Sequence, residues 1–177
     1  MNTPRIHADV YKTIQLKTMS AINQEILSCF LSMNENQFLN QTHYFQGRYE
    51  NIYINPEFIP ALKILIEHIK QEISLHLNED VNNIKFGFWI NVMHPEQTTS
   101  RHCHDDLDEV LSGVYYVKVP PHSGDLVFYA DDTITLTPQE GLLVLFSPAL
   151  EHEVKKNDSD EVRLSIGFNA SLLSIIQ

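Results

Sequence analysis

The stretch that decides the fold, residues 112–129, is SGVYYVKVPPHSGDLVFY. It contains two short runs rich in valine, tyrosine and phenylalanine, which favour β-strands. The turn signals Pro120-Pro121 and Ser123-Gly124 separate these runs. Similar apolar runs, divided by turns and not by helices, continue to both sides and predict an antiparallel sandwich or barrel. The expected strands are 84–93, 112–119, 125–129, 142–146 and 162–169.

The N-terminal part of the chain has helical periodicity instead. Ser20 is a suitable N-cap for a helix with apolar side chains at positions 22, 26, 29, 30 and 33. The polar stretch 34–42 ends this helix, and the run 48–54 is suited to an edge strand. Asn55-Pro56-Glu57 is a strong helix start, and an apolar stripe from there to Leu77 predicts a helix of about 20 residues.

These segments predict one domain over residues 1–177, with residues 1–80 as mostly helical support and residues 84–170 as the β-rich core. The chain of 177 residues carries 12 basic and 23 acidic side chains, a net charge of -11. This charge argues against partners that present phosphate groups, both nucleic acid and anionic membranes. No apolar leader or membrane span is visible, and the two cysteines are far apart, so we expect a cytoplasmic protein.

A cluster of metal-ligating residues lies at 101–106, RHCHDD. If this segment is extended, alternate residues share a face, so His102, His104 and Asp106 supply pairs that can reach one ion. A His-x-Asp pair with a distant histidine forms the facial triad of non-haem iron(II) oxygenases, which leaves positions open for a cosubstrate and O2. A polar loop without metal, or a zinc site made of three histidines, is the alternative at this stage.

Two motifs downstream extend this cluster. His152 follows the buried run 142–146, and Arg163 and Ser165 lie in the last strand. That strand has an apolar face and a polar face, so either its polar face is solvated or it lines the mouth of a barrel. In a barrel mouth, Arg163 would bind a carboxylate through two hydrogen bonds and Ser165 would add another.

The order of these motifs resembles the 2-oxoglutarate/iron(II) oxygenase superfamily. It is most similar to a family of small 2-oxoglutarate oxygenases, with a looser likeness to prolyl hydroxylases, and the likeness spans roughly residues 86–170. The motifs in chain order are His104-x-Asp106, LSGVYYV (111–117), SGDLVF (123–128), PQEGL (138–142), LFSP (145–148), His152 and RLS (163–165).

The resemblance implies a mainly β fold with N-terminal helices and a double-stranded β-helix core, the jelly roll of cupins. It implies an enzyme that uses Fe(II), 2-oxoglutarate as cosubstrate, and O2. Its default reaction is hydroxylation of an unactivated C–H bond with release of succinate and CO2. His152 would be the distal iron ligand. Residues implied to bind the cosubstrate are Arg163, Ser165, Tyr116 (in preference to Tyr115) and Asn91, which with Trp89 resembles a Trp-x-Asn motif of the family.

The proximal ligands leave two alternatives, because the small family typically has His-x-His close before the Ser-Gly-Val-Tyr-Tyr strand. Counting back from Ser112 selects His104 and Asp106, whereas counting forward from Trp89 selects His102 and His104. We select His104, Asp106 and His152 as the metal-binding and catalytic set, since a carboxylate lowers the net charge of the site. His102 would then lie beside the ligands or at the rim.

Two other function classes remain open from the sequence. One is a cupin-like metalloenzyme that does not use 2-oxoglutarate, in which Arg163 would point away from the metal. The other is a non-catalytic jelly-roll binding module, in which the ligand candidates would not converge. For the oxygenase we expect a small-molecule or an amino-acid or peptidyl substrate, no nucleic-acid or membrane partner, and we leave a homodimer open.

Overall fold

The computed structural model of the protein describes residues 10–104 and 108–173. Its helices are α1 (Ser20–Ser32) and α2 (Pro60–Leu77), with short 3-10 turns at Glu35–Gln37, Pro56–Phe58 and Val81–Asn83. Neither described α-helix is long and apolar enough to cross a membrane. The strands are β1 (Tyr11–Gln15), β2 (Phe38–Phe45), β3 (Arg48–Ile54), β4 (Ile84–Met93), β5 (Glu109–Lys118), β6 (Leu126–Tyr129), β7 (Thr133–Leu136), β8 (Leu142–Phe146), β9 (Glu151–Val154) and β10 (Arg163–Leu172).

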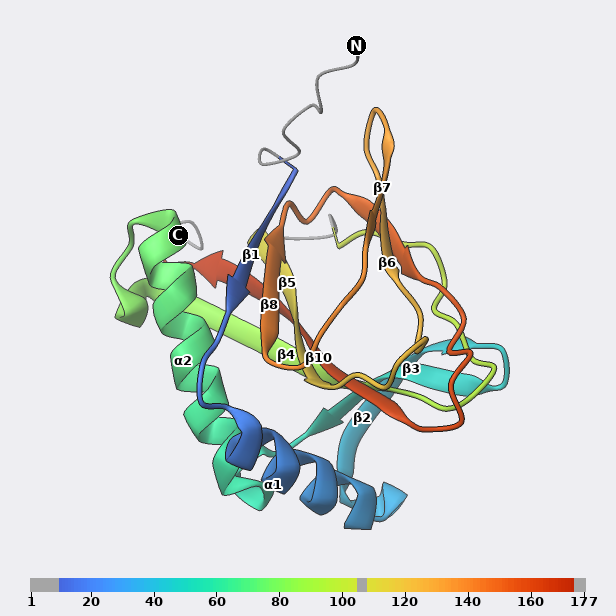
Figure 1. The fold of residues 1–177 in the computed structure, drawn as a ribbon. Helices are drawn as coiled ribbons and strands as arrows, with labels where there is room; N and C mark the ends of the chain where they lie inside the picture. The colour runs from blue at the N-terminus through green and yellow to red at the C-terminus, as the bar shows by residue number, and fades with distance from the viewer. Residues whose placement is uncertain (1–9, 105–107, 174–177) are drawn as a thin grey trace.

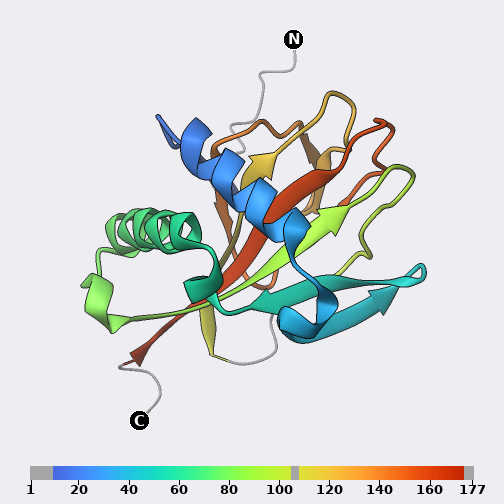
Figure 2. The ribbon, with the colours of Figure 1, turned by 90° about the horizontal axis from the view of Figure 1, so that it is seen from below.

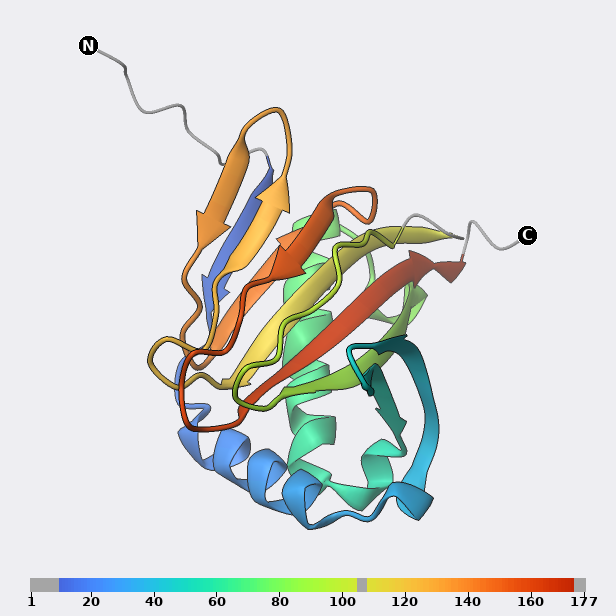
Figure 3. The ribbon, with the colours of Figure 1, turned by 90° about the vertical axis from the view of Figure 1, so that its right-hand side faces the viewer.

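The strands form two antiparallel sheets. The large sheet has the order β1-β8-β5-β10-β4-β3-β2, and the small sheet has the order β7-β6-β9. Figure 1 shows both helices on one side of the large sheet and the β6–β7 hairpin on the other. Figure 2 shows α1 and α2 next to one another, and Figure 3 shows the small sheet in front of the large sheet. This arrangement confirms the expected mainly β fold with N-terminal helices and a double-stranded β-helix core.

Strand β8 shows how one strand serves two cores. All five of its residues, LLVLF, are buried. Because successive side chains of a strand point to opposite faces, Leu143 and Leu145 join the core beneath the helices, whereas Leu142, Val144 and Phe146 face the small sheet. A strand that is covered on both faces needs a continuous apolar run, which is the pattern that the sequence has here.

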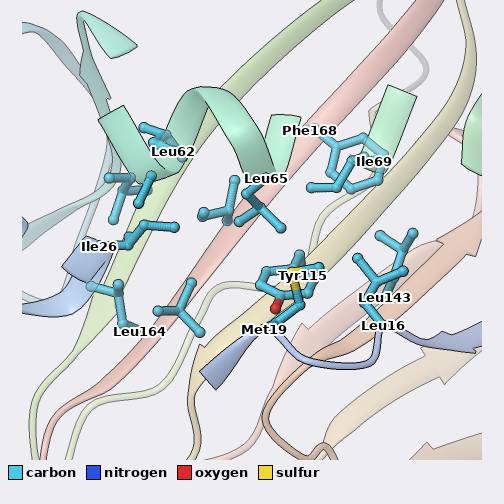
Figure 4. Close-up of a cluster of buried hydrophobic side chains, with 14 of the residues drawn as sticks. Leu16, Met19, Ile26, Leu62, Leu65, Ile69, Tyr115, Leu143, Leu164 and Phe168 are labelled. Carbon is cyan, nitrogen blue, oxygen red and sulfur yellow. The ribbon is translucent and has the colours of Figure 1, made fainter. Parts of the chain in front are cut away.

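The helix-side core fastens the N-terminal helices to the large sheet. Figure 4 shows Ile26 of α1 and Leu65 of α2 close to Leu164 of β10, within a larger set of buried side chains. Tyr115 of β5 joins this core, and its hydroxyl donates a hydrogen bond of 2.8 Å to Oδ1 of Asn23 on α1. The neighbouring residue on β5, Tyr116, points to the other face of the sheet. Tyr116 therefore faces the small sheet, and its role in binding the cosubstrate stays a prediction.

The N-terminal third contributes more strands than expected. β2 covers most of the stretch 34–42 that was predicted only to end a helix, and it makes β3 an internal strand instead of an edge. Elsewhere in the chain, β1, β7 and β9 were also not predicted. β2 and β7 alternate apolar and polar residues weakly and are partly exposed, so they lack the apolar runs that identify central strands.

We predict that Tyr115→Phe lowers the free energy of unfolding by about 1–2 kcal/mol, since it leaves the buried Oδ1 of Asn23 without a donor. Urea unfolding followed by circular dichroism measures this change. Tyr44→Phe is the matched control, because Tyr44 is 67% exposed and its substitution is expected to change stability by less than about 0.5 kcal/mol. Equal effects of the two substitutions would contradict the prediction.

Candidate metal and cosubstrate site

Three histidines from two neighbouring segments come together inside the barrel. His152 lies on β9, and residues 98–104 run antiparallel beside it. The backbone N–H of His102 donates to the carbonyl of His152 at 3.0 Å, and that of His152 donates to the carbonyl of His102 at 2.9 Å. The N–H of His104 donates to the carbonyl of Pro148 at 2.8 Å. Backbone hydrogen bonds therefore fix the positions of all three residues.

The three imidazole rings face one another. Their potential ligand atoms all lie within 4.8 Å of one another, and the ring centroids of His102 and His152 are 4.5 Å apart. Nδ1 of His102 lies 2.8 Å from the carbonyl of Ser100, and Nδ1 of His152 lies 2.9 Å from the carbonyl of Leu150. When these Nδ1 atoms carry the proton, both rings present Nε2 as an electron-pair donor, which is how second-layer carbonyls orient metal-binding histidines.

Electrostatics keep two of these rings neutral at physiological pH. Burial, with smaller contributions from the neighbouring histidines, lowers the pKa of His104 to about 3. Burial and the proximity of His102 lower the pKa of His152 to about 4. Only a neutral imidazole can bind a metal ion, so these rings do not have to release a proton on binding. Three convergent nitrogen donors fit a divalent transition metal such as iron(II) or zinc.

Arg163, at the start of β10, is a buried cation with the carboxylate of Asp125 nearby but outside ion-pair distance. It is 1% exposed, and its Nη1 donates to the carbonyls of Ser123 at 3.1 Å and Gly124 at 2.5 Å. Its Nε has no hydrogen-bond partner, and no carboxylate of the described residues forms an ion pair with it. A buried guanidinium with free donors requires an anion, and a carboxylate matches the geometry of its nitrogens.

Two further buried polar groups near Arg163 also lack a hydrogen-bond partner in the described part of the chain. Within the described residues, the hydroxyl of Tyr116 has no acceptor for its proton, and Oδ1 of Asn91 has no donor. Burial raises the pKa of Tyr116, so its hydroxyl stays protonated and can donate. The guanidinium carbon of Arg163 lies 5.0 Å from the centre of the Tyr116 ring. These unpaired groups can form hydrogen bonds with a polar ligand that has several oxygen atoms.

A single pocket is lined by both the histidines and Arg163. Its wall includes Tyr116, Asn91 and Ser165, together with the apolar side chains of Val114, Leu126 and Phe146. The polar face of the last strand therefore lines the barrel interior, while Leu164 on its other face lies in the helix-side core. The interpretation of this face as solvated is wrong.

Trp89 covers one side of the pocket because Gly167 leaves room for it. The two residues pair across β4 and β10, and a Cβ on Gly167 would lie 2.5 Å from the indole. The indole centroid lies 5.3 Å from that of His104. Glu50, Asn51 and Thr99 also line the pocket and were not identified from the sequence. One feature of the sequence could have identified Glu50 as a candidate, because it is an acidic residue within a predicted strand.

The predicted ligands that the structure describes lie together. The structure brings His104 and His152 together and adds His102, which we had expected beside the ligands or at the rim. Asp106 lies outside the described residues. The binding candidates Arg163, Ser165, Tyr116 and Asn91 all line the pocket that contains the histidines. Arg163 does not point away from the candidate metal ligands, as it would in an enzyme of this fold that did not use 2-oxoglutarate.

Comparison with sequence families identifies one match. Residues 87–134 and 128–169 match the model of the family described as "Putative 2OG-Fe(II) oxygenase". These residues run from β4 to β10 and include the pocket residues named above except Glu50 and Asn51, which lie on β3. None of the curated proteins matches the chain significantly.

Solved structures with the same fold are similar over nearly the whole chain. A prolyl-4-hydroxylase from Pseudomonas putida has a TM-score of 0.73 at 19% identity, covering 93% of this chain and 95% of that one. A prolyl hydroxylase from Trichoplax adhaerens, bound to a fragment of hypoxia inducible factor, has a TM-score of 0.71 at 16% identity, with coverage of 97% and 89%. The α-ketoglutarate-dependent carbocyclase SnoK from nogalamycin biosynthesis has a TM-score of 0.70 at 16% identity, with coverage of 94% and 81%.

We predict that the metal-free protein loses stability as the pH falls from 6.5, the ordinary pKa of histidine, towards the lowered values of His104 and His152. In this window the unfolded chain binds protons that the folded chain excludes, so acid favours unfolding. Between pH 6.5 and about 4.5 the expected loss is about 2 kcal/mol for each histidine.

Urea unfolding at the two pH values measures this loss. His104→Gln is expected to reduce the pH dependence, whereas His122→Gln, at an exposed position, is expected to leave it unchanged. A pH dependence that is the same in all three proteins would show that the buried histidines are not its source.

Proposed function

We propose that this chain, a 2OG-Fe(II) oxygenase by its family match and its fold, hydroxylates a C–H bond of a small-molecule or of an amino-acid or peptidyl substrate. The enzyme class is a dioxygenase that depends on Fe(II), 2-oxoglutarate and O2. The observation that carries the proposal is that three convergent histidines and an unpaired buried arginine line one pocket. The site residues, the reaction and its products, succinate and CO2, are part of the proposal.

In this proposal His102, His104 and His152 hold the iron. Their donor atoms converge, and their backbones are fixed before any metal arrives. Asp106, which the sequence favours as a ligand, remains a candidate for the position that we give to His102. When bound, iron(II) with 2-oxoglutarate activates O2 for the oxidation of an unactivated C–H bond.

Arg163 and its neighbours bind the far carboxylate of 2-oxoglutarate. The free Nε of Arg163 and the hydroxyl of Tyr116 are donors without acceptors, and Ser165 adds a hydroxyl on the same strand face. The carbonyls of Ser123 and Gly124 hold the guanidinium from the other side, so its direction is set before the ligand binds. The apolar wall of Val114, Leu126 and Phe146 keeps water away and strengthens this charge pairing.

Trp89 and Asn51 form the opposite side of the pocket, where we place the substrate. Both residues are on strands of the large sheet, and the indole of Trp89 lies beside the ring of His104. The other fold-compatible functions have less support. In a binding module without metal there is no reason for three imidazoles to converge, and an enzyme without 2-oxoglutarate leaves the charge of Arg163 without a purpose.

We predict that addition of iron(II) and 2-oxoglutarate without O2 produces the visible metal-to-ligand charge-transfer band of such complexes. Arg163→Ala is expected to raise the 2-oxoglutarate concentration needed for this band by at least about 30-fold, because a buried charge pair loses one partner. Arg163→Lys is expected to recover only part of this loss, since lysine lacks the planar fork. Arg101→Ala, on the exposed surface, is the matched control and should not change the titration. A parent protein that gives no band contradicts the proposal.

The two ligand alternatives are separable by substitution. If His102 is the third ligand, His102→Ala weakens iron(II) binding by at least about 10-fold, while Asp106→Ala has a smaller effect. Isothermal titration without O2 measures both affinities, and His94→Ala, at an exposed position, serves as the control. The reverse order of effects would assign the ligand position to Asp106.

A further inference from the structure

Glu50 is a buried acid that the proposed chemistry leaves without a role. It lies on β3, is 3% exposed and lines the same pocket as the histidines. A buried carboxylate is unfavourable unless hydrogen bonds or an opposite charge compensate for the loss of water. The contacts of Glu50 therefore indicate what it does in this fold.

Both carboxylate oxygens of Glu50 contact a single residue, Ser100. Oε1 accepts from the backbone N–H of Ser100 at 2.8 Å, and Oε2 accepts from its hydroxyl at 2.6 Å. The guanidinium of Arg48 lies farther away, at 3.9 Å from Oε1, and donates its hydrogen bonds to the carbonyls of Val92 and Thr98. The carboxylate is thus used mainly to hold Ser100 in place.

Ser100 in turn orients a proposed iron ligand. Its carbonyl lies 2.8 Å from Nδ1 of His102, so the position of Ser100 sets the rotation of that imidazole. Other residues of this segment are held by β9, on the opposite side from Glu50. The backbone N–H groups of Thr99 and His102 donate to carbonyls of β9. Ser100 donates to Glu50 instead. The carboxylate therefore provides, at this one residue, the hydrogen bond that a neighbouring strand would otherwise supply.

We infer that Glu50 is a positioning residue for the metal site, acting through Ser100 on the ring of His102. This inference rests on the proposed function, in which His102 binds the iron. It makes the β2–β3 hairpin, which lies outside the residues that match the oxygenase family, a part of the metal site. Its consequence is that the affinity for metal depends on the length of the side chain at position 50 more than on its charge.

Two substitutions separate length from charge. Glu50→Gln keeps the length and can still accept from the N–H of Ser100, whereas Glu50→Asp keeps the charge beside Arg48 but cannot reach both groups. The probe is Co(II) alone, titrated into the metal-free full chain and followed by its visible absorption. We expect Glu50→Asp to weaken Co(II) binding about 10-fold, and Glu50→Gln to remain within about threefold of the parent. Binding that is kept by Asp and lost with Gln would show a charge effect and overturn the inference, as would no change in either variant.

A double-mutant cycle tests whether the effect passes through His102. In a His102→Ala background, Glu50→Asp is expected to cause no further loss of Co(II) affinity, because the ring that Glu50 orients is gone. An equal loss in both backgrounds would overturn the inference while leaving the proposed ligands intact. If His102→Ala by itself binds Co(II) as tightly as the parent, the proposed ligand set fails, and the inference fails with it.

A control variant separates positioning from general destabilisation. Asn23→Ala removes another buried polar side chain, on α1 and away from the pocket, and with it the hydrogen bond from Tyr115. It is expected to lower the thermal unfolding temperature without changing Co(II) affinity. If Asn23→Ala weakens Co(II) binding as much as Glu50→Asp does, the effect at position 50 is one of stability and the inference is wrong.

Discussion

The two backbone hydrogen bonds between His102 and His152 are the constraint on which the rest of the site depends. They join a segment without regular structure to β9, so that two distant parts of the chain present imidazoles to one point. Each ring is then oriented by the same local device, the carbonyl of the residue two positions before it. β9 is itself held in register by β6, where Phe128 pairs with His152. The backbone positions of these two histidines thus come from strand-like pairing.

The site also requires that strands of the large sheet are buried on both faces. Leu164 anchors β10 beneath the helices, and Arg163 and Ser165 on the opposite face line the pocket. A guanidinium can be held unpaired in such a place only because its strand is fixed by apolar contacts on the other side. The helices therefore support the anion site through β10, although none of their side chains lines the pocket. Binding residues on a rigid scaffold of this kind do not need to be ordered by the ligand.

Much of this arrangement could be predicted from the sequence. The parts that could not be predicted share one physical cause. Runs such as LLVLF at β8 and the alternation around Arg163 are strong local signals, because burial on two faces leaves few choices of residue. β2 and β9 are short or half-exposed, so their residues satisfy weaker constraints and leave no clear pattern. The place of His102 beside His104 and His152 was left open by the sequence for a related reason. Its place in the cluster follows from pairing with β9, a long-range contact that spacing along the chain does not reveal. Glu50 was missed because its partner, Ser100, is distant in sequence.

The chain contains one tryptophan, Trp89, and Gly167 allows it to lie against the ring of His104. Indole emission is sensitive to transition-metal ions at close range, and no second tryptophan contributes a background. The protein therefore carries an intrinsic optical reporter at its own candidate metal site. Changes in the occupancy of this site can be followed in the unlabelled protein, without substrate and without turnover.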